Sequence, residues 1–435
     1  MDALRTRPDE FFRASETDAY SELVAVIESK YYPWDRIRFI ANQRGVDAKL
    51  LWAMVKFGRN SRAKRLPLQG PTGQSMTYNV ADIVLEELMH IDQQLAGRLA
   101  AEDEQPLSAT HRERFIINAL REEAIASSML EGAATTRRDA KKMLDQKRLP
   151  RTRGEQMVFN NYKAIAFIRD NRDVPLSQEF LLEIQKIITE GTLDDPGEAG
   201  RLRTTGESVQ VVDHDDQILH DPPRATELPQ RLKHLCDFAN ADDGPFLHPV
   251  LRASALHFQI GFDHPFCDGN GRTARAVFYW SMLRAGYWLF EYLPISRFIY
   301  AGPARYGRAF LYTEVEDFDL THFFVYKARL LRQARQDLRA YIARKQSEAS
   351  LARRVLEHDG RLNHRQRSLI LRISRNPDQM ITIAGHKGRQ KVAYGTARSD
   401  LLELAEWGYL VKHQQGNRFE FTAGPNLKDA KPPAP

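Results

Sequence analysis

Twelve consecutive residues combine the residue types that bind and activate a polyphosphate. The segment runs from His264 to Arg275 and reads HPFCDGNGRTAR. Gly269 and Gly271 flank Asn270, so the backbone can turn tightly and present its N–H groups to an anion. The residues that follow have a helical pattern, and a helix N-terminus adds positive potential at the same place. The spacing therefore predicts an anion site built from the backbone.

Side chains of the same segment supply the rest of a reactive site. Arg272 and Arg275 are three residues apart, so on a helix they share one face and can both bind phosphate oxygens. Asp268 offers hard oxygen ligands suited to a Mg²⁺ ion that bridges phosphates. His264, with an ordinary pKa of about 6.5, is the natural general base. An ordinary Gly-rich turn with surface arginines is the alternative, and the full string disfavours it.

This string resembles the signature of the Fic family, His-Pro-Phe-x-(Asp/Glu)-Gly-Asn-Gly-Arg-x-x-Arg, and matches every defined position. The resemblance implies a nucleotidyltransferase that moves AMP from ATP onto a Tyr, Thr or Ser hydroxyl of a target protein. It implies that His264 deprotonates this hydroxyl and that Asp268 carries Mg²⁺. It further implies that Asn270 and the amides of Gly269 and Gly271 cradle the α-phosphate.

A second motif lies upstream, where residues 127–132 read SSMLEG. It resembles the inhibitory helix motif of the Fic family, which places Ser127 and Glu131 in the inhibitory element. The resemblance implies that Arg272 contacts the β-phosphate and Arg275 the γ-phosphate. Glu131 would then pair with Arg275 and block the γ-phosphate, and it would also serve the removal of AMP from a modified target. A glutamate that faces solvent is the alternative.

Two weaker resemblances concern the surroundings of the motif. Arg203, Val209 and Val211 lie in a segment similar to the Fic flap, a β-hairpin that would pair with an extended target segment. An ordinary surface hairpin is the alternative. Tyr306 stands where the first tyrosine of the adenine pocket would be, although Gly307 replaces the second. A position in the hydrophobic core explains Tyr306 equally well.

Three neighbouring residues need separate interpretation. Asp263 occupies a position that is usually apolar in the family; an inward carboxylate would raise the pKa of His264, and we expect it to face solvent. His257, one heptad before His264, is interpreted as a packed or hydrogen-bonded core residue. Cys267 occupies a variable position of the signature, which argues against a nucleophilic role.

Helical periodicity dominates the chain and predicts a mainly α fold with a β-hairpin flap. The stretch 65–79 is rich in Gly and Pro and is interpreted as a loop. We expect four parts, which are a helical N-terminal extension at 1–105, a Fic domain at 106–345 with the inhibitory helix at about 111–132, a winged helix at 360–424, and a disordered tail at 425–435.

The winged-helix prediction rests on two short helical patterns followed by a hairpin pattern with Gly416 and Asn417 at its tip. Residues 361–420 contain 11 Lys and Arg against 5 Asp and Glu, so the net charge of +6 is concentrated here. Such a module would bind DNA, bind a protein or form a homodimer, and the sequence leaves these alternatives open.

The composition sets the broad class. Of 435 residues, 42% are hydrophobic and 28% charged, and only two are cysteines. These values, with no long apolar run and no signal peptide pattern, predict a soluble cytoplasmic protein that does not enter a membrane.

A nucleotide-sensing, DNA-binding transcriptional regulator built on a Fic fold is the competing interpretation. A sensor does not need the base His264, which favours the enzyme.

Overall fold

The computed structural model describes residues 2–95, 109–207, 209–212, 218–241, 245–358, 360–375, 379–415 and 418–428. Two compact units divide the chain, Met1–Arg335 and Gln336–Pro435. Helices form most of both units, which confirms the mainly α fold class. Within the described ranges, no helix is both long and apolar enough to cross a membrane.

The N-terminal part of the first unit is a helical bundle with one β-hairpin. Asp47 caps one of these helices by accepting hydrogen bonds from the amides of Lys49 and Leu50 at 2.8 and 3.1 Å. The elements are α1 (Asp2–Thr6), α2 (Pro8–Ser15), α3 (Asp18–Lys30), α4 (Trp34–Arg44), α5 (Ala48–Arg62), β1 (Lys64–Gln69), β2 (Ser75–Tyr78) and α6 (Asp82–Leu95).

The hairpin β1–β2 corrects the prediction of a loop at 65–79. Its strands pair antiparallel, and Leu66, Leu68, Met76 and Tyr78 alternate with exposed residues so that their side chains are buried. Burial of these four side chains stabilises the two strands. Most of the Gly and Pro residues that suggested a loop lie in and next to the turn, where they do not disrupt the pairing of the strands.

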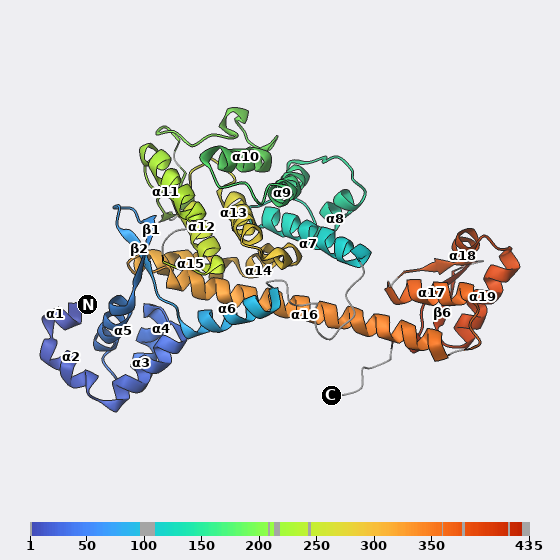
Figure 1. The fold of residues 1–435 in the computed structure, drawn as a ribbon, viewed down its shortest axis with the longest axis horizontal. Coiled ribbons are helices and arrows are strands. Elements are labelled where there is room, and N and C mark those ends of the chain that lie inside the picture. The colour runs from blue at the N-terminus through green and yellow to red at the C-terminus, as the bar shows by residue number, and fades with distance from the viewer. Residues whose placement is uncertain are drawn as a thin grey trace. The chain divides into compact units, whose positions relative to one another are not determined.

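The remainder of the first unit is the helical core that carries the motif (Figure 1). Its elements are α7 (Ala109–Leu130), α8 (Arg137–Asp145), α9 (Arg153–Asp170), α10 (Gln178–Thr189), η1 (Pro196–Glu198), β3 (Val211–Val212), β4 (Ile218–His220), η2 (Ala225–Glu227), α11 (Leu228–Asn240), α12 (Pro249–Asp263), α13 (Asn270–Arg284), η3 (Trp288–Tyr292), α14 (Ile295–Tyr300), α15 (Pro303–Val315) and the start of α16 (Thr321–His358).

Helix α13 lies at the centre of this core. It packs against α12, α9, α10 and α7, and nearly all of its residues are buried, including Phe278 and Trp280. A helix surrounded on all sides is held in place by packing over its whole length. The core therefore fixes the N-terminus of α13, where the motif residues lie.

The second unit folds around its own small hydrophobic core. Leu369, Ile373, Leu401 and Phe421 are buried in it. Its elements after α16 are α17 (His364–Arg375), β5 (Ile381–Thr382), α18 (Ile383–Gln390), α19 (Tyr394–Glu406), β6 (Leu410–Gln415), β7 (Arg418–Ala423) and α20 (Pro425–Lys428). The strands form an antiparallel sheet in the order β5-β7-β6.

This arrangement adds strand β5 and helix α18 to the two helices and hairpin that the sequence indicated. The expected tip of the hairpin, Gly416 and Asn417, lies outside the described residues. The prediction of a disordered tail is wrong for 425–428, because α20 forms there and Leu427 is buried in the core of this unit. Residues 429–435 lie outside the described part of the chain.

Candidate active site

His264 opens the loop His264–Gly269 between α12 and α13, here named the motif loop. Its Nδ1 lies 2.7 Å from the carbonyl oxygen of Gly261. A carbonyl only accepts hydrogen bonds, so Nδ1 carries the proton and Nε2 keeps its lone pair. Burial lowers the pKa of His264 below its usual 6.5, against the opposing effect of the Gly261 hydrogen bond. The ring is therefore a neutral base near pH 7, with Nε2 as the basic atom.

Asn270 fixes the shape of the motif loop. Its Oδ1 accepts a hydrogen bond from the amide of Phe266 at 2.9 Å, and its Nδ2 donates to the carbonyl of the same residue at 2.8 Å. Phe266 itself is fully buried beneath the loop. The side chain of Asn270 is thus occupied within the loop, whereas the resemblance placed it against the α-phosphate.

The two glycines of the motif lie where a side chain has no room. Gly269 has a left-handed φ of 85°, and a Cβ atom there would lie 2.9 Å from Cγ2 of Thr189. A Cβ atom on Gly271 would lie 2.2 Å from Oε1 of Glu131. The N-terminus of α13 is therefore bare backbone, and the carboxylate of Glu131 lies directly against it. This is the place where the positive end of the helix favours an anion.

Arg272 and Asp268 form one side of the site. Arg272 is almost completely buried, and its Nη2 lies 3.1 Å from both carboxylate oxygens of Asp268. A third contact, from Nη1 to the carbonyl of Ile188 at 3.2 Å, fixes the guanidinium. The side chain of Asp268 is 44% exposed, so its carboxylate lies at the mouth of the site.

Arg275, Glu131 and Ser127 form the opposite side. Arg275 Nη2 donates to Oε1 of Glu131 at 2.9 Å and to the carbonyl of Ser127 at 3.0 Å, while its Nε donates to the Ser127 hydroxyl at 2.8 Å. The Arg275 side chain is 1% exposed and that of Glu131 is 31% exposed. Although burial opposes the charge of Arg275, the nearby Glu131 carboxylate raises the pKa of this guanidinium. The contact that the resemblance implied between Glu131 and Arg275 is thus present.

The flap region contributes both support and an exposed strand. Strands β3 and β4 pair antiparallel. Val211 of β3 is half-buried, as is Val209, which lies two residues before the strand. Arg203 is buried, and it donates from Nε to the carbonyl of His264 at 2.8 Å. Arg203 therefore supports the motif loop from behind. Strand β4 exposes two apolar side chains, Ile218 and Leu219, with 57% and 52% of their surfaces accessible to solvent.

Tyr306 belongs to a buried polar chain beside Arg275. Its hydroxyl lies 2.8 Å from Nε2 of His257, and Nδ1 of His257 lies 3.4 Å from Nζ of Lys327. His257 is fully buried and hydrogen-bonded, as expected. Burial raises the pKa of Tyr306 to about 12 and lowers that of Lys327 to about 7. Sequence reasoning missed Lys327 because nothing in the spacing links α16 to the motif.

The prediction that Asp263 faces solvent is wrong. Its side chain is 1% exposed, and Oδ1 accepts hydrogen bonds from Arg231 Nε at 2.7 Å and from Gln259 Nε2 at 2.8 Å. The carboxylate points inward, but its charge is balanced by Arg231. It therefore does not raise the pKa of His264, which is shifted downward.

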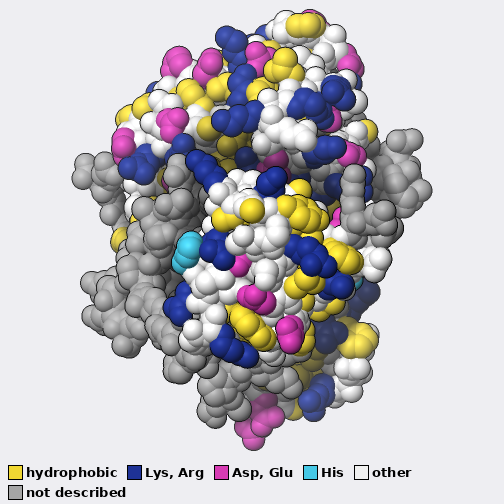
Figure 2. All heavy atoms as spheres, turned by 90° about the vertical axis from the view of Figure 1, so that its right-hand side faces the viewer, with side chains coloured by type: hydrophobic (Ala, Val, Ile, Leu, Met, Phe, Trp, Pro, Cys, Tyr) yellow, Lys and Arg dark blue, Asp and Glu magenta, His cyan; other side chains and the backbone are white. Residues whose placement is uncertain are grey.

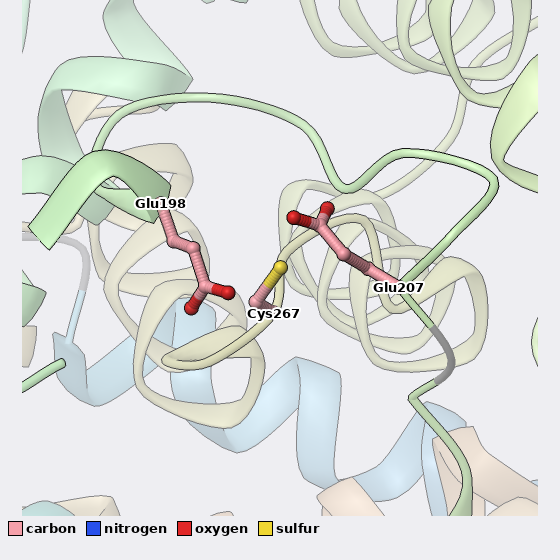
Figure 3. Close-up of side chains that lie close together, drawn as sticks. All are labelled: Glu198, Glu207 and Cys267. Carbon is pink, nitrogen blue, oxygen red and sulfur yellow. The ribbon is translucent and has the colours of Figure 1, made fainter. Parts of the chain in front are cut away.

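Cys267 lies between two carboxylates, those of Glu198 and Glu207 (Figure 3). One ligand atom from each of the three residues lies within 4.8 Å of the others. Arg201 already neutralises Glu207 through a hydrogen bond of 2.8 Å. Burial, with the hydrogen bond to Glu207, raises the pKa of the Cys267 thiol to about 12. A protonated thiol that donates to Glu207 explains this cluster, and it is a poor nucleophile.

The fold and this geometry together define the class of the domain. Residues 175–282 match the model of the Fic/DOC family. A crystal structure of a Fic family protein from Desulfovibrio desulfuricans G20 aligns with a TM-score of 0.53 and 21% identity, covering 82% of this chain and 99% of that one. The chain therefore contains a Fic/DOC-family domain.

Among curated proteins, similarity is limited to this domain. The protein adenylyltransferase Fic of Nematostella vectensis is 38% identical over 92 residues, which is 21% of this chain and 20% of that protein. The protein adenylyltransferase fic-1 of Caenorhabditis elegans is 36% identical over 93 residues, 21% of this chain and 17% of that protein. The chain thus matches about a fifth of the length of these relatives.

Proposed function

We propose that this chain is a protein adenylyltransferase that transfers AMP from ATP to a Tyr, Thr or Ser hydroxyl of a target protein. One observation carries the proposal: His264 presents an unprotonated Nε2 beside the bare N-terminus of α13. The named adenylyltransferases that match over this domain support it.

In the proposed reaction, Nε2 of His264 removes the proton of the target hydroxyl. The hydroxyl oxygen then bonds to the α-phosphorus of ATP, and the bond from that phosphorus to the bridging oxygen of the β-phosphate breaks. Pyrophosphate leaves with the electron pair of the broken bond. The α13 amides, Arg272 and Arg275 would stabilise the developing negative charge, so positioning and electrostatics provide most of the catalysis.

Asp268 fits the Mg²⁺ site that this chemistry uses. Its carboxylate is a hard ligand at the mouth of the site, next to the backbone that would hold the phosphates. Mg²⁺ usually binds through one or two protein carboxylates and completes its shell with phosphate oxygens and water, so a single aspartate is sufficient. The ion would neutralise the charge of the leaving pyrophosphate.

Glu131 would restrain the enzyme. Its carboxylate occupies Arg275 and lies against Gly271, so a γ-phosphate directed at Arg275 competes with it for the same guanidinium. In this proposal ATP binds in a non-productive pose until Glu131 moves away. The same carboxylate could position water to remove AMP from a modified target.

Label transfer from ATP tests the reaction class. The full chain is incubated with cell lysate and Mg²⁺, using ATP labelled either on the α- or on the γ-phosphate. Protein labelled only by the α-labelled nucleotide supports AMP transfer. Protein label from the γ-labelled nucleotide that appears only when the chain is added, and not in lysate alone, would identify a kinase and overturn the proposal.

DNA is a second candidate ligand, which the surface of the second unit favours. The α18–α19 segment exposes four basic residues, Lys387, Arg389, Lys391 and Arg398. Asp400 of α19 instead points inward, to Arg365 at 2.8 Å. Figure 2 shows Lys and Arg side chains scattered among hydrophobic and acidic ones on the face turned to the viewer. A nucleotide-sensing regulator would use this surface, as would an enzyme recruited to DNA.

A further inference from the structure

The N-terminal hairpin contacts the end of α12, immediately before the motif loop. Arg231 of α11 makes the connection, because it donates from Nη1 to the carbonyl of Gly70 at 3.1 Å and from Nη2 to the carbonyl of Gln69. The third nitrogen, Nε, donates to Oδ1 of Asp263 at 2.7 Å. A single guanidinium thus joins the end of β1 to the residue that precedes His264.

Gln259 strengthens the same connection from α12. Its Nε2 donates to Oδ1 of Asp263 at 2.8 Å and to the carbonyl of Gln69 at 3.3 Å. The ion pair is buried, since the side chains of Arg231 and Asp263 are 4% and 1% exposed. A buried ion pair is weak evidence for stability, because desolvation offsets its attraction, but its geometry is well defined. We therefore explain this ion pair by the way it positions the end of α12, and not by a gain in stability.

His264 is the residue that needs such support. Its backbone is left-handed, with φ 43° and ψ 58°, which is uncommon for a residue with a side chain. A conformation of this kind persists where the surroundings hold it on several sides. Arg203 holds the carbonyl of His264 from the flap side, and Arg231 holds the side chain of Asp263 from the hairpin side.

We propose that the hairpin β1–β2 positions His264 through Arg231 and Asp263, so that the N-terminal extension is part of the catalytic apparatus. The inference rests on the proposed function, which it deepens. It gives a structural role to Asp263, the residue just before the Fic signature. Arg231 and Asp263 are positioning residues, since the two side chains act on the base through the backbone.

The variant Arg231→Lys in the full chain tests this proposal. Lysine keeps the positive charge beside Asp263 but cannot donate to both hairpin carbonyls and the carboxylate with the planar guanidinium geometry. We expect kcat for AMP transfer to fall about 10- to 100-fold, with KM for ATP changed less than twofold, because the base is displaced while the phosphate contacts remain. The rates are measured in a Glu131→Gly background.

Arg335→Lys provides the matched control. Arg335 also joins the N-terminal extension to the core through a buried pair, with Glu87 oxygens 2.8 and 2.9 Å from its Nε and Nη2. It lies outside the contacts of the motif loop, so its replacement should lower the melting temperature and leave kcat unchanged. Equal effects of the two variants on kcat, or an effect of Arg231→Lys on KM alone, would overturn the proposal.

Amide hydrogen exchange separates this inference from the proposed function. Arg231→Lys should increase exchange in both 66–70 and 260–266, and Arg335→Lys in neither. If the wild-type chain and Glu131→Gly transfer no AMP, the proposed function fails, and exchange alone decides whether the hairpin holds the loop. Unchanged exchange at 260–266 contradicts the link.

Should Arg231→Lys not fold, Asp263→Asn provides a second test. It keeps the side-chain shape, removes the charge and is expected to show the same loss of kcat.

Discussion

The two ring nitrogens of His264 have different surroundings, and this difference assigns their roles. Nδ1 is occupied by the carbonyl of Gly261, so only Nε2 can accept a proton from a substrate. We predict that His264→Ala abolishes transfer, with a loss of about 10²–10⁴-fold, because a positioned base is removed. ATP binding should remain, since in the proposed mode the phosphate contacts would come from α13. Labelling by the Ala variant at the wild-type rate would exclude His264 from the mechanism.

The pH dependence of transfer follows from the same residue. Burial lowers the pKa of His264 below 6.5, and the base is active only when deprotonated. Activity should therefore fall as the pH drops through a midpoint below 6.5 and remain level between pH 7 and 8. Initial rates from pH 5 to 8, with ATP well below its KM so that they report kcat/KM, measure this midpoint for the free enzyme. A midpoint above 6.5 would contradict the assignment of the buried imidazole as the base.

Asp268 allows a test by metal removal. If its carboxylate carries Mg²⁺, both excess EDTA and Asp268→Ala should reduce transfer by at least about 100-fold, because the metal stabilises transition-state charge by several kcal/mol. Readdition of Mg²⁺ should restore the wild type and leave the Ala variant inactive. Full activity in EDTA would exclude the metal from this reaction.

At the residue scale, the motif residues lie close together because the signature is contiguous in sequence. His264, Asp268, Gly269, Gly271, Arg272 and Arg275 all lie around the N-terminus of one helix. Local spacing does not predict contacts between residues that are distant in sequence, such as Arg231 and Asp263, which are 32 residues apart. The direction of the Asp263 side chain depended on that partner, so the sequence alone could not provide it.

Among the elements, the α18–α19 segment is the candidate for binding DNA, because it exposes four basic residues. If its exposed basic residues contact DNA phosphates, the double variant Arg389→Ala/Arg398→Ala should weaken binding and reduce the slope of log affinity against log salt by about 1 for each lost contact. Gel shifts at several salt concentrations measure both quantities. Lys141→Ala, an exposed lysine of α8, is the control. Absence of any shift at low salt would leave a protein-binding or dimerisation role.

Elements whose burial pattern was strong were predicted well, and elements determined by distant packing were not. The helices α7, α17 and α19 have clear apolar periodicity and occur close to the expected places. Hairpin β1–β2 was mistaken for a loop because its Gly and Pro residues hid an alternation of only four buried side chains. Helix α20 was missed because it has few anchoring side chains: Leu427 is buried in the core, and Asn426 Nδ2 donates to the carbonyl of Trp407 at 2.8 Å.

For the whole molecule, the structure connects regions that the sequence separates. The N-terminal extension, interpreted from sequence as an unassigned helical addition, belongs to the same compact unit as the Fic core. Helix α7 brings Glu131 to Arg275 across 144 residues of sequence. The proposed enzyme would thus have its base held from the N-terminal hairpin and its nucleotide site restrained from α7.

In the proposed enzyme, Glu131 restrains an otherwise intact transferase site. Replacing Glu131 with Gly should free Arg275 for the γ-phosphate, and with it the productive pose of ATP. We predict that Glu131→Gly incorporates α-labelled AMP at least tenfold faster than the wild type, where each tenfold equals about 1.4 kcal/mol of released inhibition.

Two variants control this measurement. Glu122→Gly, within α7, removes a carboxylate that pairs with Arg137 and not with Arg275, and should leave the rate unchanged. Arg275→Ala in the Glu131→Gly background should remove the gain, because the phosphate then lacks its guanidinium. Labelling with α-labelled ATP, compared between Glu131→Gly and the wild type, therefore tests the account directly: an increase of tenfold or more supports it, and an equal or lower rate in Glu131→Gly contradicts it.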